Sequence, residues 1–362
     1  MVAYISQLVP LYCRDELNKS TNNVSCASKN TGNYIFHNAI MKIFRPVLYN
    51  YTFKKDRKLC CEANEDFFLT SDFIWIIENE SLQRKTFFHI LKHLLKRKNK
   101  IVIPLSVGLQ TLFYKSDFQF HPDTIRILHE IADTITIPCR GAYTAEILSK
   151  NGIKNTIILG CPSIYTPMDT LFQINKPVNL NQNAQISINI SPHIGYRTPL
   201  ESFMAFYQYI LNNDFNIIGQ AANELQDSLY LLKVLGINEV SIEKKIIEKY
   251  KFFYNCDDWN NEFQNVDFTF GSRFHGNIMS VLNGKPALFL KIDSRMDEMC
   301  TFLNLPAIEF SYLQKKINVD MLYALADYTK FNNGYANLLE NFINFFQKLG
   351  IPLYGFSSIT HE

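Results

Sequence analysis

Short apolar segments alternate with longer amphipathic ones along the first half of the chain. Four runs rich in β-branched residues predict buried strands, over residues 72–77, 100–108, 133–139 and 155–160. Apolar residues at helical spacing predict helices over residues 87–98, 123–132 and 144–152. Since predicted strands and helices alternate, we expect a mostly parallel sheet covered by helices on both faces.

The same pattern starts again after a polar, asparagine-rich segment at residues 173–185. Downstream of it we expect strands over residues 185–191, 215–220, 251–255, 267–272 and 286–292. Helices are expected over residues 200–213, 224–236 and 276–284. A last, strongly apolar helix is predicted over residues 336–350. The repeated pattern makes the polar segment the best candidate for a linker between two domains.

The predicted fold class is therefore α/β, with two Rossmann-like domains that face each other across a cleft. We expect an N-terminal domain over residues 1–178 and a C-terminal domain over residues 179–335. Residues 336–362 form a C-terminal helix and tail, whose apolar pattern allows it to pack back on the N-terminal domain. The length of 362 residues agrees with two hydrophobic cores.

Composition narrows the class of protein further. The net charge is only +2, which argues against nucleic acid as a partner. The dense basic run at residues 92–100 is interpreted as the solvated end of a helix. We find neither an apolar stretch of membrane-spanning length nor a secretory signal pattern, and the eight cysteines include no CxxC pair. These features predict a cytoplasmic protein with reduced thiols and no metal site; His89 and His93, four residues apart, are interpreted as an exposed helix face.

The sharpest local motif follows the predicted strand 267–272, where Ser272, Arg273, His275 and Gly276 precede a helix. Polar groups at the carboxyl ends of parallel strands lie where open α/β sheets bind ligands. An arginine there can bind a phosphate or carboxylate through two hydrogen bonds, and a histidine can exchange a proton near neutral pH. A purely structural role, in which both side chains only cap the loop, explains the same residues.

Three further polar turns occupy comparable places. They contain Arg140 after the strand 133–139, then Ser106, Gly108 and Gln110 after the strand 100–108, and finally Asn30, Gly32 and Asn33 before an apolar helix. The structural alternatives are a salt bridge for Arg140, an ordinary glycine turn at Gly108, and a helix N-cap at Asn33. Walker-type, GxGxxG, HExxH and GxSxG motifs do not occur in the sequence.

In their order and spacing, these motifs resemble the polysaccharide pyruvyl transferase family over roughly residues 30–310. The resemblance rests on N-x-G-[DN], S-x-G-x-Q, an Arg followed by E-x-L-x-x-x-G, and R-x-H-G followed by G-x-P. In this sequence the third motif includes Glu146, Leu148 and Gly152, and the fourth ends at Gly284 and Pro286. Four positions depart from the usual family pattern. The usual Asp of the first motif is Asn33, the usual acid after Arg140 is Gly141, and the usual Asp before Pro162 is Cys161. The usual Tyr-Asp-x-Lys segment corresponds to Ile292, Asp293, Ser294 and Arg295.

The resemblance implies a glycosyltransferase-B-like architecture and transfer of the enolpyruvyl group of phosphoenolpyruvate. The group is joined to two hydroxyls of a sugar as a cyclic pyruvate ketal, during biosynthesis of capsule, exopolysaccharide or cell-wall glycans. The implied catalytic residues are His275 and Arg273. The implied donor-binding residues are Arg273, His275, Gly276, Arg140, Ser272 and Arg295, and the acceptor-binding ones are Asn30, Gly32, Asn33, Ser106 and Gln110.

The implied partners are phosphoenolpyruvate and a glycan, lipid-linked or nucleotide-linked sugar acceptor, without a cofactor or metal. A lipid-linked acceptor would bring the protein to the inner face of the membrane through its substrate. Chemistry supports the donor assignment, because one histidine can protonate the vinyl methylene and deprotonate an attacking hydroxyl. Two alternatives stay open: a nucleotide-sugar-dependent glycosyltransferase of the same architecture, and a non-catalytic subunit of a glycan assembly complex.

Overall fold

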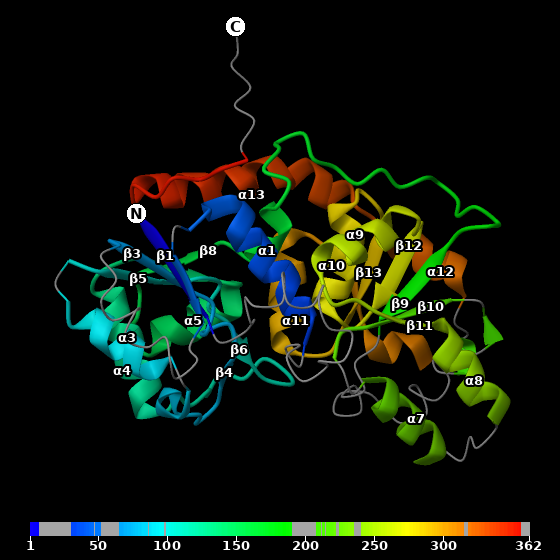
Figure 1. The fold of residues 1–362 in the computed structure, drawn as a ribbon, viewed down its shortest axis with the longest axis horizontal. Helices are drawn as coiled ribbons and strands as arrows, with labels where there is room; N and C mark the ends of the chain where they lie inside the picture. Colours follow the sequence, from blue (N-terminus) through cyan, green and yellow to red (C-terminus); the bar gives the residue numbers. More distant parts are fainter. Residues whose placement is uncertain are drawn as a thin grey trace, which may run out of the picture.

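Two parallel sheets form the framework of the part of the chain that the computed structural model describes (Figure 1). The structure describes residues 1–6, 30–46, 48–51, 65–85, 87–97, 99–189, 208–210, 212–213, 215–221, 224–234, 240–314 and 318–355. The expected α/β class with parallel sheets is confirmed. The expected helix over residues 200–213, four of the cysteines and His193 lie largely or wholly outside the described residues.

The N-terminal half is built on a four-stranded parallel sheet in the order β2-β1-β3-β5. Its strands are β1 (Val2–Ser6), β2 (Leu48–Tyr51), β3 (Phe67–Thr70) and β5 (Ile101–Pro104). Two small parallel pairs extend it, made by β4 (Ile76–Ile77) with β6 (Leu109–Gln110), and by β7 (Ile137–Cys139) with β8 (Thr156–Ile158). The helical segments are α1 (Gly32–Phe44), η2 (Leu82–Arg84), α3 (Phe88–Leu95), α4 (Pro122–Ala132), α5 (Ala142–Lys150) and η3 (Pro162–Tyr165).

The C-terminal half contains a six-stranded parallel sheet in the order β11-β10-β9-β12-β13-β14. Its strands are β9 (Ile186–Asn189), β10 (Asn216–Gly219), β11 (Tyr250–Phe252), β12 (Phe268–Gly271), β13 (Ala287–Lys291) and β14 (Ala307–Glu309). The helices are α7 (Glu224–Val234), α8 (Val240–Lys249), α9 (Cys256–Gln264), α10 (Phe274–Leu282), α11 (Ser294–Leu303), η5 (Phe310–Gln314) and α12 (Val319–Leu325). The central strands β9, β12 and β13 are almost entirely buried and apolar, as expected for a sheet covered on both faces.

One predicted strand is wrong. Residues 72–77 were expected to form a buried strand, but only Ile76 and Ile77 are in strand conformation. The segment before them turns, because Thr70 Oγ1 donates to Asp72 Oδ2 at 2.8 Å and Ile74 N donates to Ser71 O at 3.2 Å. Phe73 and Ile74 of this segment are buried all the same, and burial was the basis of the prediction. The sheet strand is the preceding segment, β3.

The last helix, α13 (Thr329–Lys348), begins well before residue 336, where it was expected. Its aromatic residues lie against the N-terminal half: Phe346 is 4.7 Å from Phe44, and Phe342 is 4.4 Å from Tyr165, between ring centroids. Tyr328, which precedes the helix, bonds both Ala287 N and Ala287 O of β13. The chain end therefore contacts both halves (Figure 1).

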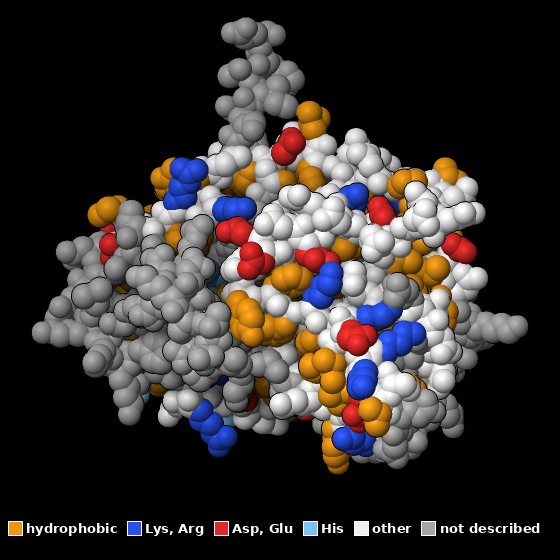
Figure 2. Space-filling model, turned by 45° about the vertical axis from the view of Figure 1, so that its right-hand side comes forward, with side chains coloured by type: hydrophobic (Ala, Val, Ile, Leu, Met, Phe, Trp, Pro, Cys, Tyr) orange, Lys and Arg blue, Asp and Glu red, His pale blue; other side chains and the backbone are white. Residues whose placement is uncertain are grey.

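The linker candidate, residues 173–185, contains neither helix nor strand and leads into β9. It is attached to α13, because Ile174 N donates to Asn332 Oδ1 at 2.8 Å and Asn332 Nδ2 donates to Ile174 O at 3.0 Å. The domain limits at residues 178 and 335 stay predictions. Figure 2 shows basic and acidic side chains mixed over one face of the molecule, without an extended basic area among the described residues of that face.

Candidate functional site

The turn between β12 and α10 is held rigidly by two buried asparagines. Asn189 Oδ1 accepts a hydrogen bond from Arg273 N at 2.8 Å, and Asn189 Nδ2 donates to Asn277 Oδ1 at 2.7 Å. Asn277 Nδ2 in turn donates to Gly271 O at 2.8 Å. Gly276 is required by this packing, since a Cβ there would lie 2.8 Å from Asn189 Cγ. These contacts place His275 in the first turn of α10, at the carboxyl end of the central strand β12.

His275 faces a thiol from the N-terminal half. Its Nε2 atom lies 3.7 Å from Sγ of Cys161, which directly precedes η3 and is fully buried. Burial, followed by the charges of Arg140 and Arg295, lowers the pKa of His275 to about 3. The imidazole is therefore neutral at pH 7, and it is close enough to both arginines to respond to their charge.

Arg140 is held in place by the serine–glycine turn that follows β5. Its Nε atom donates to Ser106 Oγ at 3.1 Å and to Ser106 O at 3.2 Å, and the guanidinium is 3% exposed overall. Gly108 makes room for it, since a Cβ there would lie 2.7 Å from Arg140 Cδ. Burial lowers the pKa of Arg140 to about 10, and repulsion from Arg295 acts in the same direction. Arg140 keeps its charge at neutral pH even so.

Arg295 reaches the same region from the first turn of α11. Its Nη2 and Nε atoms donate to Asp293 Oδ2 at 2.8 and 3.2 Å, and its guanidinium lies 5.6 Å from the centre of the Trp75 ring. Asp293 also caps α11, since its Oδ1 accepts from Met296 N at 2.9 Å. The structure thus brings His275 and Arg295 of the C-terminal half together with Arg140 and Cys161 of the N-terminal half.

Arg273 lies differently. It forms an ion pair with Glu224, the first residue of α7, and its buried Nε atom has no hydrogen-bond partner. Glu224 also accepts a hydrogen bond from Gln220 N at 2.6 Å. The neighbouring Ser272 is buried and donates through its backbone N to Asn189 O at 2.8 Å. Arg273 therefore meets a carboxylate of its own half, whereas the charges that act on His275 come from Arg140 and Arg295.

The residues expected at the acceptor site fall into two groups. Asn30, Gly32 and Asn33 lie at the start of α1, where the backbone N and Oγ1 of Thr31 donate to Gln220 O at 2.6 and 3.0 Å. Ser106 is engaged by Arg140, and Gln110 ends β6 in a partly exposed position. The interpretation of Asn33 as the helix N-cap is wrong, because α1 begins at Gly32 and Asn30 Oδ1 accepts from Gly32 N at 3.0 Å.

Figure 1 draws α1 between the two sheets, and the helix packs against η3 of one half and α10 of the other. Both groups of expected acceptor residues therefore come from the N-terminal half, and both lie next to elements of the C-terminal half.

Glu298, a buried carboxylate of α11, was not among the site residues expected from the sequence. Its Oε2 accepts from Thr144 N at 2.9 Å and its Oε1 accepts from Thr144 Oγ1 at 2.8 Å, so it holds the start of α5. Burial raises the pKa of Glu298 to about 7, against the opposing effect of the two Thr144 donors. Gly141 leaves space for this side chain, since a Cβ there would lie 2.6 Å from Glu298 Cβ. The unusual glycine after Arg140 was thus the one sign of it in the sequence.

The same helix attaches to β6. Ser294 Oγ donates to Leu109 O at 3.1 Å and accepts from Thr111 N at 3.1 Å, while Ser294 N donates to Thr111 O at 2.9 Å. The start of α11 is therefore joined to β6 and α5, and Gln110 lies beside the segment that carries Arg295.

The described residues contain neither a cluster of metal ligands nor a membrane-spanning helix. No group of three or more His, Cys, Asp or Glu side chains within them is arranged to hold a metal ion. Among the helices that the structure describes, none has the length and apolar character needed to cross a membrane. Cys139, Cys161, Cys256 and Cys300 are free thiols.

Comparison with known proteins gives a family match and a fold match. The model of the family "Polysaccharide pyruvyl transferase" matches residues 30–294, well over half of the chain. No curated protein sequence matches significantly. Among solved structures, UDP-GlcNAc 2-epimerase from Methanocaldococcus jannaschii is similar at 11% identity and a TM-score of 0.50, over 96% of this chain and 100% of that one. The epimerase from Neisseria meningitidis bound to UDP-GlcNAc gives 12% identity and a TM-score of 0.49, over 96% and 100%. At these identities the epimerase from Methanocaldococcus jannaschii indicates the fold alone.

Proposed function

Since the chain belongs to the polysaccharide pyruvyl transferase family, we propose that it moves the enolpyruvyl group of phosphoenolpyruvate onto two hydroxyls of a glycan sugar. The product would be a cyclic pyruvate ketal in capsule, exopolysaccharide or cell-wall glycan biosynthesis. The observation that carries the proposal is the convergence of Arg140, Arg295 and His275 from two halves of the molecule.

Phosphoenolpyruvate has a phosphate and a carboxylate, so its site needs cations that stay charged in a dry environment. Arg140 and Arg295 fit this need, because both are largely buried and lie close enough for the charge of Arg295 to act on Arg140. Charge-assisted hydrogen bonds from arginine to such anions are strong when water is excluded. Arg273 belongs to the proposed donor site as well, and there it exchanges Glu224 for the anion.

His275 is the proposed proton carrier. Protonation of the vinyl methylene makes C2 oxocarbenium-like, a sugar hydroxyl attacks C2, and the bond from C2 to the phosphate oxygen breaks. A second hydroxyl closes the ring. Of the two hydroxyl protons, one balances the proton added to the methylene and the other leaves with phosphate. A histidine that donates the first proton and accepts the next serves both steps.

The acid role requires the donor to be bound. Without it, burial and two arginine charges keep the pKa of His275 at about 3, so the ring carries no proton to give. A bound anion offsets the charges of Arg140 and Arg295 and so raises the pKa of the imidazole. Protonation of His275 is thereby coupled to donor binding, and an empty site holds a neutral base.

The test is release of phosphate from phosphoenolpyruvate in the presence of glycosides that have two neighbouring free hydroxyls. We expect His275→Gln to keep donor-induced thermal stabilisation and to lose about 10²–10⁴-fold in turnover, the usual contribution of a positioned acid or base. His89→Gln is the matched control, because His89 is exposed on α3. Full activity in His275→Gln would remove the histidine from the mechanism. Stabilisation by nucleotide sugars but not by phosphoenolpyruvate would favour a glycosyltransferase. If neither ligand raised the melting temperature, a non-catalytic subunit would be favoured.

A further inference from the structure

Three consecutive large apolar side chains are exposed in the loop that follows β6. Leu112, Phe113 and Tyr114 are 46%, 58% and 51% exposed. Ile77 of β4, which pairs with Gln110 of β6, is also 46% exposed. Contiguous exposed apolar residues on a soluble fold commonly mark a surface that another molecule covers.

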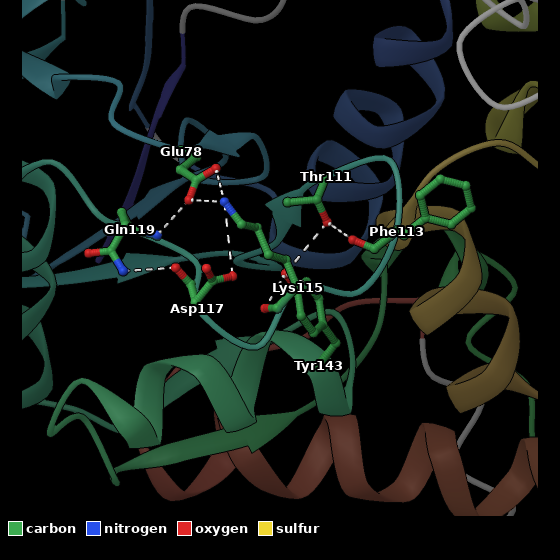
Figure 3. A network of polar contacts seen from close by, with 7 residues as sticks. All are labelled: Glu78, Thr111, Phe113, Lys115, Asp117, Gln119 and Tyr143. Carbon is green, nitrogen blue, oxygen red and sulfur yellow. Dashed lines mark hydrogen bonds and ion pairs between the residues drawn. The ribbon is translucent and has the colours of Figure 1, made fainter.

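The loop is held in this exposed conformation by an ion pair at its centre. Lys115 Nζ lies 2.8 and 2.9 Å from the two carboxylate oxygens of Glu78, and Gln119 N donates to Glu78 Oε1 at 3.0 Å. Figure 3 shows Glu78 as the point to which both parts of the loop are tied. The exposure of the apolar residues is thus a feature of an anchored segment.

A second anchor comes from α5. Tyr143 Oη accepts from Lys115 N and donates to Lys115 O, both at 3.2 Å, and its ring lies 4.7 Å from that of Tyr114. At the start of the loop, Thr111 Oγ1 donates to Phe113 O at 2.6 Å. The Phe113 ring projects away from these polar contacts in Figure 3. The polar contacts of the loop therefore come from its backbone and from Thr111, Lys115 and Tyr143, while Phe113 remains 58% exposed.

The loop borders the candidate site. Thr111 is bonded to Ser294, the residue before Arg295, and Tyr143 follows Arg140 by three positions in the first turn of α5. Arg295 directly follows the anchor Ser294, and Arg140 lies three residues before the anchor Tyr143. Both arginines act on His275.

We propose that Leu112, Phe113 and Tyr114 form a contact surface for the sugar acceptor, with a pyranose ring packed on Phe113. The proposal rests on the proposed function, and it assigns the acceptor glycan to the side of the site formed by β6 and α5. The C–H face of a pyranose is apolar and packs on aromatic rings, while its hydroxyls need polar partners such as Gln110 at the end of β6.

Local charge favours a glycan over a membrane surface. The loop carries one lysine, which is paired with Glu78, whereas Asp117 is exposed and lies 4.0 Å from the same lysine. The loop itself therefore carries no lysine or arginine that lacks a carboxylate partner. Loops that bind anionic lipids instead combine apolar residues with unpaired cations.

The experiment compares Phe113→Ala with Phe113→Tyr and with Tyr230→Ala, a matched exposed aromatic of α7. Binding of methyl β-D-glucoside, methyl β-D-galactoside and methyl α-D-mannoside is followed by saturation-transfer NMR, which needs no turnover. Phosphate release is measured in parallel against acceptor and donor concentration. We expect Phe113→Ala to raise the acceptor KM about tenfold and to weaken the saturation-transfer signal. The melting temperature, kcat and the KM for phosphoenolpyruvate should stay unchanged, and Phe113→Tyr should restore binding.

Glycoside binding by Phe113→Ala equal to that of the wild type would overturn the assignment. So would loss, in this variant alone, of co-sedimentation with vesicles of phosphatidylglycerol and phosphatidylethanolamine, or a change in the oligomeric state measured by light scattering. The first result would indicate a lipid contact and the second an interface between two copies. Absence of phosphate release from the wild type would contradict the proposed function, while the NMR comparison would still decide the role of Phe113.

Discussion

Replacing Glu298 by glutamine should change how stability depends on pH. The carboxyl is 2% exposed, and burial raises its pKa to about 7 from an ordinary value of 4.5. Below pH 4.5 both the folded and the unfolded chain hold this proton. As the pH rises from 4.5 to 7 the unfolded chain releases it while the folded chain keeps it, so this group lowers the free energy of unfolding.

The magnitude follows from the pKa difference. Each pH unit in this window removes about 1.4 kcal/mol, so wild-type protein should lose about 3 kcal/mol between pH 5 and pH 8 through Glu298. Glutamine at this position does not titrate. Its amide can keep both contacts with Thr144, because the amide oxygen accepts from Thr144 N and the amide nitrogen donates to Thr144 Oγ1, so any cost of the substitution is independent of pH.

The assay is urea unfolding of the wild type and Glu298→Gln at pH 5, 6, 7 and 8. The quantity of interest is the free energy of unfolding of the variant minus that of the wild type. We expect this difference to grow in favour of the variant by about 3 kcal/mol across the range. Glu146→Gln is the matched control for removal of a carboxylate, since Glu146 is exposed on α5 and pairs with Lys150. A difference that stays constant from pH 5 to pH 8 would refute the reasoning.

The remaining predictions concern the site and its support. Gly108→Ala should push Arg140 from its place, because a Cβ there lies 2.7 Å from Arg140 Cδ, and we expect loss of the thermal stabilisation by phosphoenolpyruvate; a shift equal to the wild type's would contradict this. Binding of phosphoenolpyruvate at pH 7 should take up protons, because it raises the pKa of His275 from about 3, and calorimetry in buffers of different ionisation enthalpy should find this uptake absent in His275→Gln. Phe342→Ala should destabilise the fold by about 3–5 kcal/mol in urea unfolding, since its buried ring packs on Tyr165; a loss below 1 kcal/mol would mean that this contact is dispensable.

The sequence predicted the parts of the fold that depend on local pattern. Strand β12 and helix α10 were expected because an apolar run ends in a glycine and polar residues precede an amphipathic segment. The strand expected at residues 72–77 failed because hydrophobicity reports burial, and a turn can also be buried when its polar groups bond one another, as Thr70 and Asp72 do. β1 and β2 were missed: β2 is an edge strand, and β1 lies between β2 and β3.

The site was predictable only as far as its members follow their own strands. Arg140 directly follows β7, His275 lies in the first turn of the helix after β12, and the structure brings both to Cys161 and Arg295. Glu298 was not predictable in this way, because its partner Thr144 is 154 residues away and the contact exists only in the assembled fold. The ion pair of Arg273 with Glu224 has the same origin. Sequence pattern places a residue on a helix or strand. Which distant side chain it then pairs with depends on how the helices and strands pack.

The position of α13 has a mechanical consequence for the molecule. The chain passes between the halves through residues 173–185 and returns through Tyr328 and α13. Two hydrogen bonds between Ile174 and Asn332 join these two passages. Two connections therefore join the halves at one edge, and sliding or twisting of one half against the other would disturb the contacts of both. A backbone cut within residues 175–185 would leave the halves tethered through α13, so the register between Arg140 and His275 depends on both passages.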